Sequence, residues 1–172
     1  IQFPHWFAQS DVDGFKTYYD RALTMADRVM FTSACTGKEV REYCVSQGIP
    51  IRDSAVVPMG SDIVGKQSSS AKLRMPIETQ KFALFVSTIE PRKNHRLLVD
   101  AWRALANAGV VGKSGFKLVF VGRPGWDMGN FYHEIATDSL LKDTVFHLDN
   151  VDDEELSILY QNAGFCLYPP KF

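Results

Sequence analysis

Two adjacent cations, Arg92 and Lys93, stand directly after a sharp turn and directly before a predicted helix. The turn, Glu90-Pro91, follows an apolar stretch, 82–87, that is typical of a buried strand. Free backbone N–H groups and the positive end of a helix favour an anion, and the two side-chain charges add to that preference. We therefore predict a phosphate site, in which the Arg92 guanidinium and the Lys93 ammonium neutralise a diphosphate group.

A solvated first helical turn is the alternative interpretation of this pair. The N-terminus of a helix disfavours cations by roughly 0.3–1 kcal/mol each, so two of them need compensation, which a bound anion supplies. His95 follows the pair and could touch the same phosphate, although a surface histidine is the simpler interpretation.

A second candidate contact is Gly122-Arg123-Pro124-Gly125, which follows another strand-like stretch. A glycine at the end of a strand lets a ligand approach the backbone closely. Ordinary loop chemistry explains the same residues, because the segment is neither G-x-G-x-x-G nor a Walker A sequence.

Carboxylates open the last predicted helix, at 151–155. The helix dipole favours them there, so capping is the default role of Asp152, paired with Glu155. Asp153 could also accept hydrogen bonds from a nucleobase edge. Asp11 and Asp13 have the D-x-D spacing of metal-dependent sugar transferases, but we interpret them as turn and capping residues, and the scattered histidines suggest no metal site.

Composition bounds the class of protein. The 172 residues are 45% hydrophobic and 23% charged, with a net charge of −1. These values are typical of a globular protein and exclude a broad nucleic-acid surface. Three cysteines without a C-x-x-C pair argue for a reducing, cytoplasmic location. No apolar run approaches the ~20 residues of a membrane span, while a peripheral membrane contact through the aromatic N-terminal stretch stays open.

Strand-like and helix-like stretches alternate in the second part of the chain. Strands are predicted at 82–87, 116–121, 144–148 and 164–168, with helices at 94–109, at 131–138 and from 152. Asn94 is the expected N-cap of the first of these helices. Because such alternation implies parallel strands with right-handed crossovers, the predicted class is α/β, a Rossmann-like sheet flanked by helices.

The first part carries fewer elements. A helix is predicted at 15–25, strands at 29–32 and 55–57, and a second helix between a capping box of Thr36 with Glu39 and a left-handed Gly48. The polar stretch 65–71 reads as exposed loop. We therefore predict two domains, 1–63 and 81–172, joined by a linker at 64–80.

The segment Ser87-Thr-Ile-Glu-Pro-Arg-Lys-Asn94, with Leu97-Leu98, resembles the donor-domain entry of GT-B glycosyltransferases. It is most similar to the retaining group, glycosyltransferase family 4, that includes bacterial mannosyltransferases of polysaccharide assembly. The likeness continues in Val119-Phe-Val-Gly122, Asn150-Val-Asp-Asp-Glu-Glu-Leu156 and Ala163-Gly-Phe-Cys-Leu-Tyr-Pro169. Earlier, Ala26-Asp-Arg-Val29, Thr32-Ser33 and Val57-Pro-Met-Gly60 resemble the end of that fold's N-terminal domain.

This resemblance implies two Rossmann-like domains facing a cleft, of which the second binds a nucleotide-diphospho-sugar. Lys93 matches the family's phosphate-binding lysine, and Arg92 stands beside it in a minority pattern. The other residues at donor-binding positions are Ser87, Thr88, Gly122, Arg123, Val151 and Asp153. Of these, Val151 and Asp153 stand where family members line the base.

The implied reaction moves a mannose-like hexose to a glycan or lipid-linked acceptor with retention of configuration. It uses no metal and no cofactor besides the donor, because Arg92 and Lys93 stabilise the leaving diphosphate. The chain departs from the family where Ser87-Thr88 replaces a common Gly-Arg, a loss for which Arg92 substitutes. It also stops before the family's Glu-x7-Glu segment, so we expect a fragment truncated at both ends and inactive alone.

Two other classes stay open. A non-catalytic nucleotide- or phosphosugar-binding module has the same fold, and a Glu-Gly-Phe-Gly-like continuation after Phe172 would favour the enzyme over it. A flavodoxin-like regulatory domain would need a phosphorylatable aspartate after its first strand, where this chain has Ser87 and Thr88.

Overall fold

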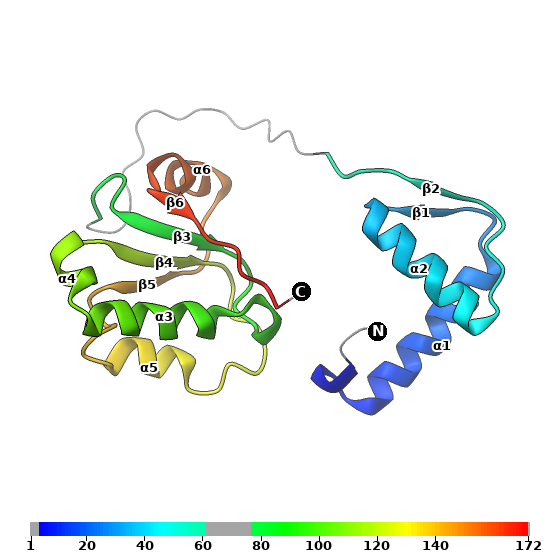
Figure 1. Cartoon of the computed structure of the whole chain (residues 1–172), viewed down its shortest axis with the longest axis horizontal. Helices are drawn as coiled ribbons and strands as arrows, with labels where there is room; N and C mark the ends of the chain where they lie inside the picture. The colour runs from blue at the N-terminus through cyan, green and yellow to red at the C-terminus, as the bar shows by residue number, and fades with distance from the viewer. Residues whose placement is uncertain (1–3, 61–76, 172) are drawn as a thin grey trace. The chain divides into compact units, whose positions relative to one another are not determined.

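The computed structural model describes residues 4–60 and 77–171. The chain divides into two compact units, Ile1–Ile63 and Val64–Phe172, each with its own parallel sheet (Figure 1). Most of the predicted linker, including 65–71, lies outside the described residues. No helix in the two described ranges is long and apolar enough to span a bilayer.

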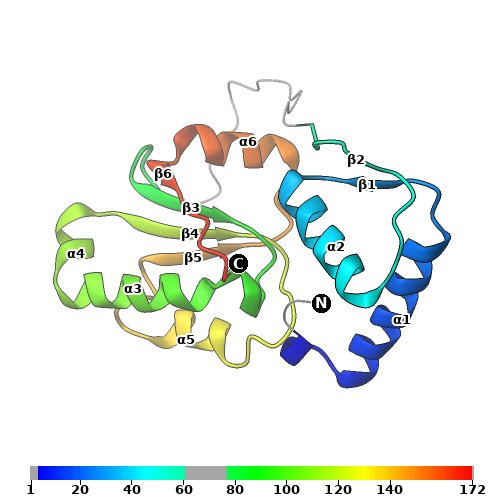
Figure 2. The same cartoon turned by 45° about the vertical axis from the view of Figure 1, so that its right-hand side comes forward.

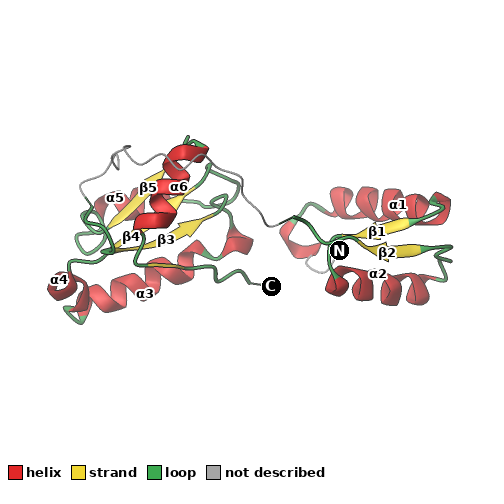
Figure 3. Cartoon of the chain, turned by 90° about the horizontal axis from the view of Figure 1, so that it is seen from above, coloured by secondary structure: helices red, strands yellow, loops and turns green. Residues whose placement is uncertain are grey.

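The first unit packs helices on a two-stranded sheet. Its elements are η1 (Pro4–Trp6), α1 (Gln9–Met25), β1 (Val29–Phe31), α2 (Ala34–Gln47) and β2 (Ser54–Val56). The two strands lie side by side in parallel, Val29 opposite Ser54 (Figure 3). Their core consists of Leu23, Phe31, Val40 and Cys44.

Local capping in this unit differs from the prediction at two points. Ser33, extended at φ −152°, caps α2 by accepting a hydrogen bond from the Thr36 N–H at 3.1 Å, so Thr36 is not the cap. Gly48 ends α2 in the predicted left-handed conformation. The helix α1 begins before Asp11 and Asp13, so both lie within the helix and neither caps it; Asp11 is in its first turn, and Asp13 accepts a hydrogen bond from the Gln9 side chain.

The second unit is a parallel sheet covered on both faces. Its strands, in the spatial order β5-β4-β3-β6, are β3 (Phe82–Val86), β4 (Lys117–Val121), β5 (Val145–Leu148) and β6 (Phe165–Cys166). Its helices are α3 (His95–Asn107), α4 (Val110–Ser114), α5 (Phe131–Thr137) and α6 (Asp153–Asn162). The α/β class and the parallel strands are confirmed, while the short α4 was not predicted.

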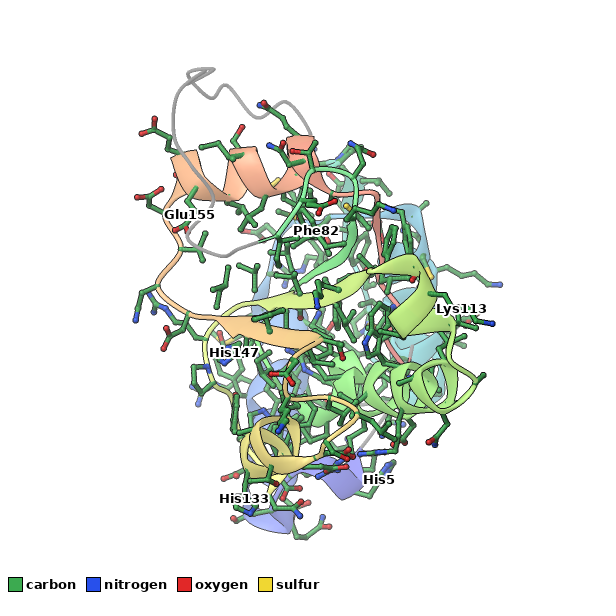
Figure 4. The ribbon with its side chains drawn as sticks, turned by 90° about the vertical axis from the view of Figure 1, so that its left-hand side faces the viewer. His5, Phe82, Lys113, His133, His147 and Glu155 are labelled. Carbon is green, nitrogen blue, oxygen red and sulfur yellow. The ribbon has the colours of Figure 1, made fainter. Side chains whose placement is uncertain are left out.

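Helices α3 and α5 cover one face of this sheet and α6 covers the other (Figure 1). Along β3, Ala83 and Phe85 pack toward α3, whereas Phe82 and Leu84 pack toward α6, the side on which Figure 4 shows Phe82. Because both faces are buried, the strand has a continuous apolar sequence instead of an alternating one.

The entry to α3 also differs from the prediction. Pro91–Lys93 forms a separate 3-10 turn, η2, and Asn94 follows it in the left-handed region at φ 66°. Asn94 is the N-cap residue of α3, as predicted, but it is left-handed and its side chain makes no cap hydrogen bond. Arg92 and Lys93 therefore lie in the 3-10 turn before α3, outside its first helical turn.

Candidate functional site

The carboxyl ends of the parallel strands bring the predicted site residues to one edge of the sheet. Ser87 follows β3, Gly122 follows β4 and Val151 comes after β5. Figure 2 shows β3, β4 and β5 side by side. Since parallel strands end at the same edge, the loops after β3 and β4 are neighbours there, with the β5 loop next in order.

The loops after β3 and β4 are joined by backbone hydrogen bonds. The Ser87 N–H donates to the Val121 carbonyl at 2.8 Å, and the Ile89 N–H donates to the Arg123 carbonyl at 3.0 Å. A further parallel bridge joins Ile89 to Pro124. Ser87, Thr88, Gly122 and Arg123 are therefore brought together, as a continuation of the β3–β4 pairing.

Gly122 is needed for this pairing. Its φ is 152°, and a Cβ built on it would stand 2.0 Å from the Ser87 carbonyl oxygen. The close approach that a glycine permits here is that of the neighbouring loop. His147 of β5, visible in Figure 4, joins the same loop, since its Nε2 donates to the Gly122 carbonyl at 2.8 Å.

The guanidinium of Arg92 is paired within the protein. Its Nε lies 2.5 Å from Oε1 of Glu90, a carboxylate that is only 5% exposed. The other oxygen of Glu90 accepts a hydrogen bond from the Trp126 indole N–H at 3.2 Å. Glu90 thus holds Arg92 and the loop after Gly122 together, and it neutralises much of the charge that we assigned to phosphate binding.

Lys93 has a different environment. Its Nζ donates to the Tyr168 hydroxyl at 2.9 Å and stands 5.4 Å from the centroid of that ring. Within residues 4–60 and 77–171, the structure gives its ammonium no acidic partner. No carboxylate of the described residues therefore compensates the charge of Lys93 at the sheet edge.

The segment after β6 supports the turn that carries these cations. The Leu167 N–H donates to the Leu84 carbonyl at 2.8 Å, and the Lys171 N–H donates to the Arg92 carbonyl at 3.0 Å. The Tyr168 ring meets the Phe85 ring edge-on, with 5.8 Å between centroids. Tyr168 is thereby fixed beside η2.

His95 is neither a surface residue nor a phosphate contact. It is fully buried, with its ring centroid 4.5 Å from that of Phe85 and 5.2 Å from that of Phe120. Both predictions for this residue are wrong, because the first position of α3 faces the apolar core of the sheet. Burial lowers the pKa of His95 to about 4, although the Glu90 backbone opposes the shift, so the imidazole is neutral at pH 7.

The residues predicted to line a base lie at the start of α6. Asp152 is the predicted cap, with its carboxylate accepting from the Glu155 N–H at 2.8 Å. Val151 is half-buried against the core beneath α6, and Asp153 is exposed in the first turn. Both share the sheet edge with the cations, one strand beyond Gly122.

Three residues of this edge were not predicted as site residues: Glu90, Trp126 and Tyr168. Their partners are distant in sequence, at separations of 36 for Trp126 with Glu90 and 75 for Tyr168 with Lys93. The only sequence signal for Tyr168 is its position as the last residue of the predicted strand 164–168, which ends at the same edge.

The family described as "Glycosyl transferases group 1" matches residues 68–171. The Escherichia coli serotype-specific mannosyltransferase WbdA is 23% identical over 176 residues, covering 96% of this chain and 21% of the relative. The E. coli O-antigen chain mannosyltransferase B is 30% identical over 90 residues, covering 52% and 23%. The chain thus spans about a fifth of the length of these relatives.

Solved structures share the fold. The pneumococcal O-GlcNAc transferase GtfA, in complex with UDP and GlcNAc, matches with a TM-score of 0.62 and 18% identity, over 90% of this chain and 28% of its own. TarM matches with a TM-score of 0.58 and 13% identity, over 91% and 27%. These neighbours are GT-B glycosyltransferases, which confirms the predicted fold class. Since the matched segment covers more than half of its residues, the chain belongs to the group 1 glycosyl transferases.

Proposed function

We propose that the intact protein transfers a mannose-like hexose from a nucleotide-diphospho-sugar to a glycan or lipid-linked glycan acceptor. The observation that carries this proposal is the Lys93 ammonium, which stands at the carboxyl edge of the parallel sheet with the neutral Tyr168 hydroxyl as its partner. Such an edge is where open α/β sheets bind nucleotides. The names of the relatives support mannose, and the UDP of the GtfA complex supports a nucleotide donor.

The chemical task of the site is to stabilise negative charge on the departing diphosphate. When the bond from the sugar to the diphosphate breaks, charge develops on the leaving oxygen, and a cation already fixed nearby lowers the barrier. Lys93 supplies this charge in full, and Arg92 supplies less because of Glu90. We propose that this charge takes the role that a metal ion has in other transferases, and that the reaction retains the anomeric configuration.

The other predicted contacts are proposed to divide the donor between them. Ser87, Thr88, Gly122 and Arg123 surround the point where the diphosphate would meet the loops after β3 and β4. Val151 and Asp153 would meet the base. The free thiols Cys35, Cys44 and Cys166 support a cytoplasmic location, and a lipid-linked acceptor would require peripheral contact with a membrane.

Calorimetric titration of the intact protein with GDP, UDP and ADP tests the donor-binding part of this proposal. We expect one diphosphate to bind best and Lys93→Ala to weaken that ligand about tenfold or more, since a charged hydrogen bond contributes about 1.5–3 kcal/mol. Lys113→Ala is the control, because Lys113 is an exposed lysine on α4 (Figure 4). Equal affinities of the Lys93→Ala and wild-type proteins would contradict the proposal, whereas binding without sugar transfer would favour the non-catalytic module.

A further inference from the structure

The Tyr168 hydroxyl has hydrogen-bonding capacity that the protein does not use. A phenol can accept and donate, and here its oxygen accepts from Lys93 Nζ. In the part of the chain that the structure describes, no group accepts its proton, and the residue is 61% exposed. Lys93 likewise keeps two of its three N–H donors. Two donor groups 2.9 Å apart are thus available to one external acceptor.

Tyr168 is positioned by a ring contact and by backbone hydrogen bonds of the residues around it. Its ring packs edge-on against Phe85, and the Leu167 backbone beside it is bonded to Leu84 of β3. Three residues further on, the backbone N–H of Lys171 is bonded to the carbonyl of Arg92. A hydroxyl fixed in this way loses little conformational entropy when it binds a ligand.

The charges around Lys93 and Tyr168 indicate which kind of ligand these two groups can bind. Arg92 and Glu90 form an internal ion pair, so their charges largely cancel. Of these two neighbouring cations, Lys93 is the one without a carboxylate partner among the described residues, and the donor beside it is neutral. One ammonium with one neutral O–H donor matches a phosphate group, whose oxygens accept several hydrogen bonds and carry negative charge.

We propose that Tyr168 is a second phosphate donor of the site: its hydroxyl accepts from Lys93 and donates to an oxygen of the phosphate that Lys93 binds. This inference rests on the proposed function for the identity of the ligand, a nucleoside diphosphate. In this inference Tyr168 binds the ligand directly, in addition to packing against Phe85.

The test uses the intact protein with Tyr168→Phe, which removes the hydroxyl and keeps the ring that contacts Phe85 and Lys93. Tyr160→Phe is the matched control, since Tyr160 is an exposed tyrosine on α6 of the same unit. The probes are inorganic pyrophosphate, the best-binding of GDP, UDP and ADP, and the corresponding nucleoside without phosphate.

We expect Tyr168→Phe to weaken pyrophosphate and the nucleoside diphosphate by about 3- to 10-fold, the effect of one hydrogen bond, and to leave the nucleoside unchanged. Tyr160→Phe should change none of the three affinities. In a Lys93→Ala background, Tyr168→Phe should have a smaller effect, because the two groups act on one phosphate. A purely structural tyrosine would instead weaken all three ligands alike or none.

The outcomes separate this inference from the proposed function. If the wild type binds a nucleoside diphosphate and Tyr168→Phe binds it equally well, the Tyr168 assignment is wrong and the transferase proposal survives. If pyrophosphate binding depends on Tyr168 but no nucleoside diphosphate binds, the anion site stands and the donor assignment is wrong. If the wild type binds neither ligand, both are wrong.

Discussion

The buried carboxylate of Glu90 pairs with the guanidinium of Arg92, with 2.5 Å between Oε1 and Nε. This pairing makes the two neighbouring cations unequal. Arg92 contributes to the fold by compensating a buried charge, whereas Lys93, bonded to a neutral hydroxyl, is available to a ligand. We therefore expect Arg92 to act mainly in the fold and Lys93 mainly in ligand binding.

Arg92→Ala should reduce stability more than ligand binding. Glu90 would be left buried without its cation, and we expect a loss of about 1–3 kcal/mol in the free energy of unfolding. Urea denaturation of the intact protein measures it. The double variant Glu90→Gln/Arg92→Ala should recover part of the loss, because its buried side chain is neutral. A single variant as stable as the wild type would show that the ion pair contributes nothing.

Gly122→Ala should disrupt the edge of the sheet. The new Cβ would stand 2.0 Å from the Ser87 carbonyl oxygen, so the two loops must separate. We expect about 2–4 kcal/mol of destabilisation together with weaker diphosphate binding. Gly112→Ala is the control, since a Cβ there meets nothing within 4 Å. Urea midpoints and calorimetry measure the two effects, and an unchanged Gly122→Ala protein would refute this account of the glycine.

His95 should make the protein less stable in mild acid. Burial lowers its pKa to about 4 from an ordinary value of 6.5, so the unfolded chain takes up a proton before the folded protein does. Stability then falls as the pH drops from about 6.5 to about 4, by up to about 3 kcal/mol. Urea midpoints measured across this range test the prediction.

The control for this pH effect is a pair of variants. His95→Leu should flatten the dependence on pH in this range, whereas His133→Gln, at an exposed histidine on α5 (Figure 4), should leave it as in the wild type. A His95→Leu protein with the wild-type slope would contradict the assignment of the effect to this buried imidazole.

Mutations of the neighbouring carboxylates Asp152 and Asp153 should have different effects on stability and on ligand affinity. Asp152→Ala removes the cap of α6 and should reduce stability by about 1 kcal/mol with little effect on ligand affinity. Asp153→Ala should leave stability nearly unchanged and weaken the nucleoside diphosphate but not pyrophosphate, because its proposed contact is the base. If Asp153→Ala leaves both affinities unchanged, its proposed base contact is wrong.

The parallel sheet was predictable because apolar stretches such as 82–87 alternate with helix-like stretches, and this pattern depends on local sequence. The caps Gly48 and Asp152 were predictable for the same reason. The cap Ser33 was not predicted, since serine and threonine are both favoured N-cap residues and only Thr36 has a glutamate three residues later.

The side-chain contacts within the site were less predictable than the positions of its residues at the sheet edge. Parallel topology alone brings Ser87 and Gly122 to neighbouring strand ends. The Glu90–Arg92 pair and the Lys93–Tyr168 bond depend instead on side-chain directions in the η2 turn and on a residue 75 positions away. The burial of His95 was not predicted, because the local sequence around a histidine in a cationic segment is the same whether its ring faces the core or the solvent.

The most direct test of the central claim is the turnover number of the intact enzyme with its nucleotide-diphospho-sugar donor, measured for Lys93→Ala beside Lys113→Ala. If Lys93 stabilises the leaving diphosphate, Lys93→Ala should lower turnover by about 10²-fold or more at saturating donor while its urea midpoint stays within the range of the control. A Lys93→Ala enzyme that folds normally and turns over its donor at the wild-type rate would contradict the claim.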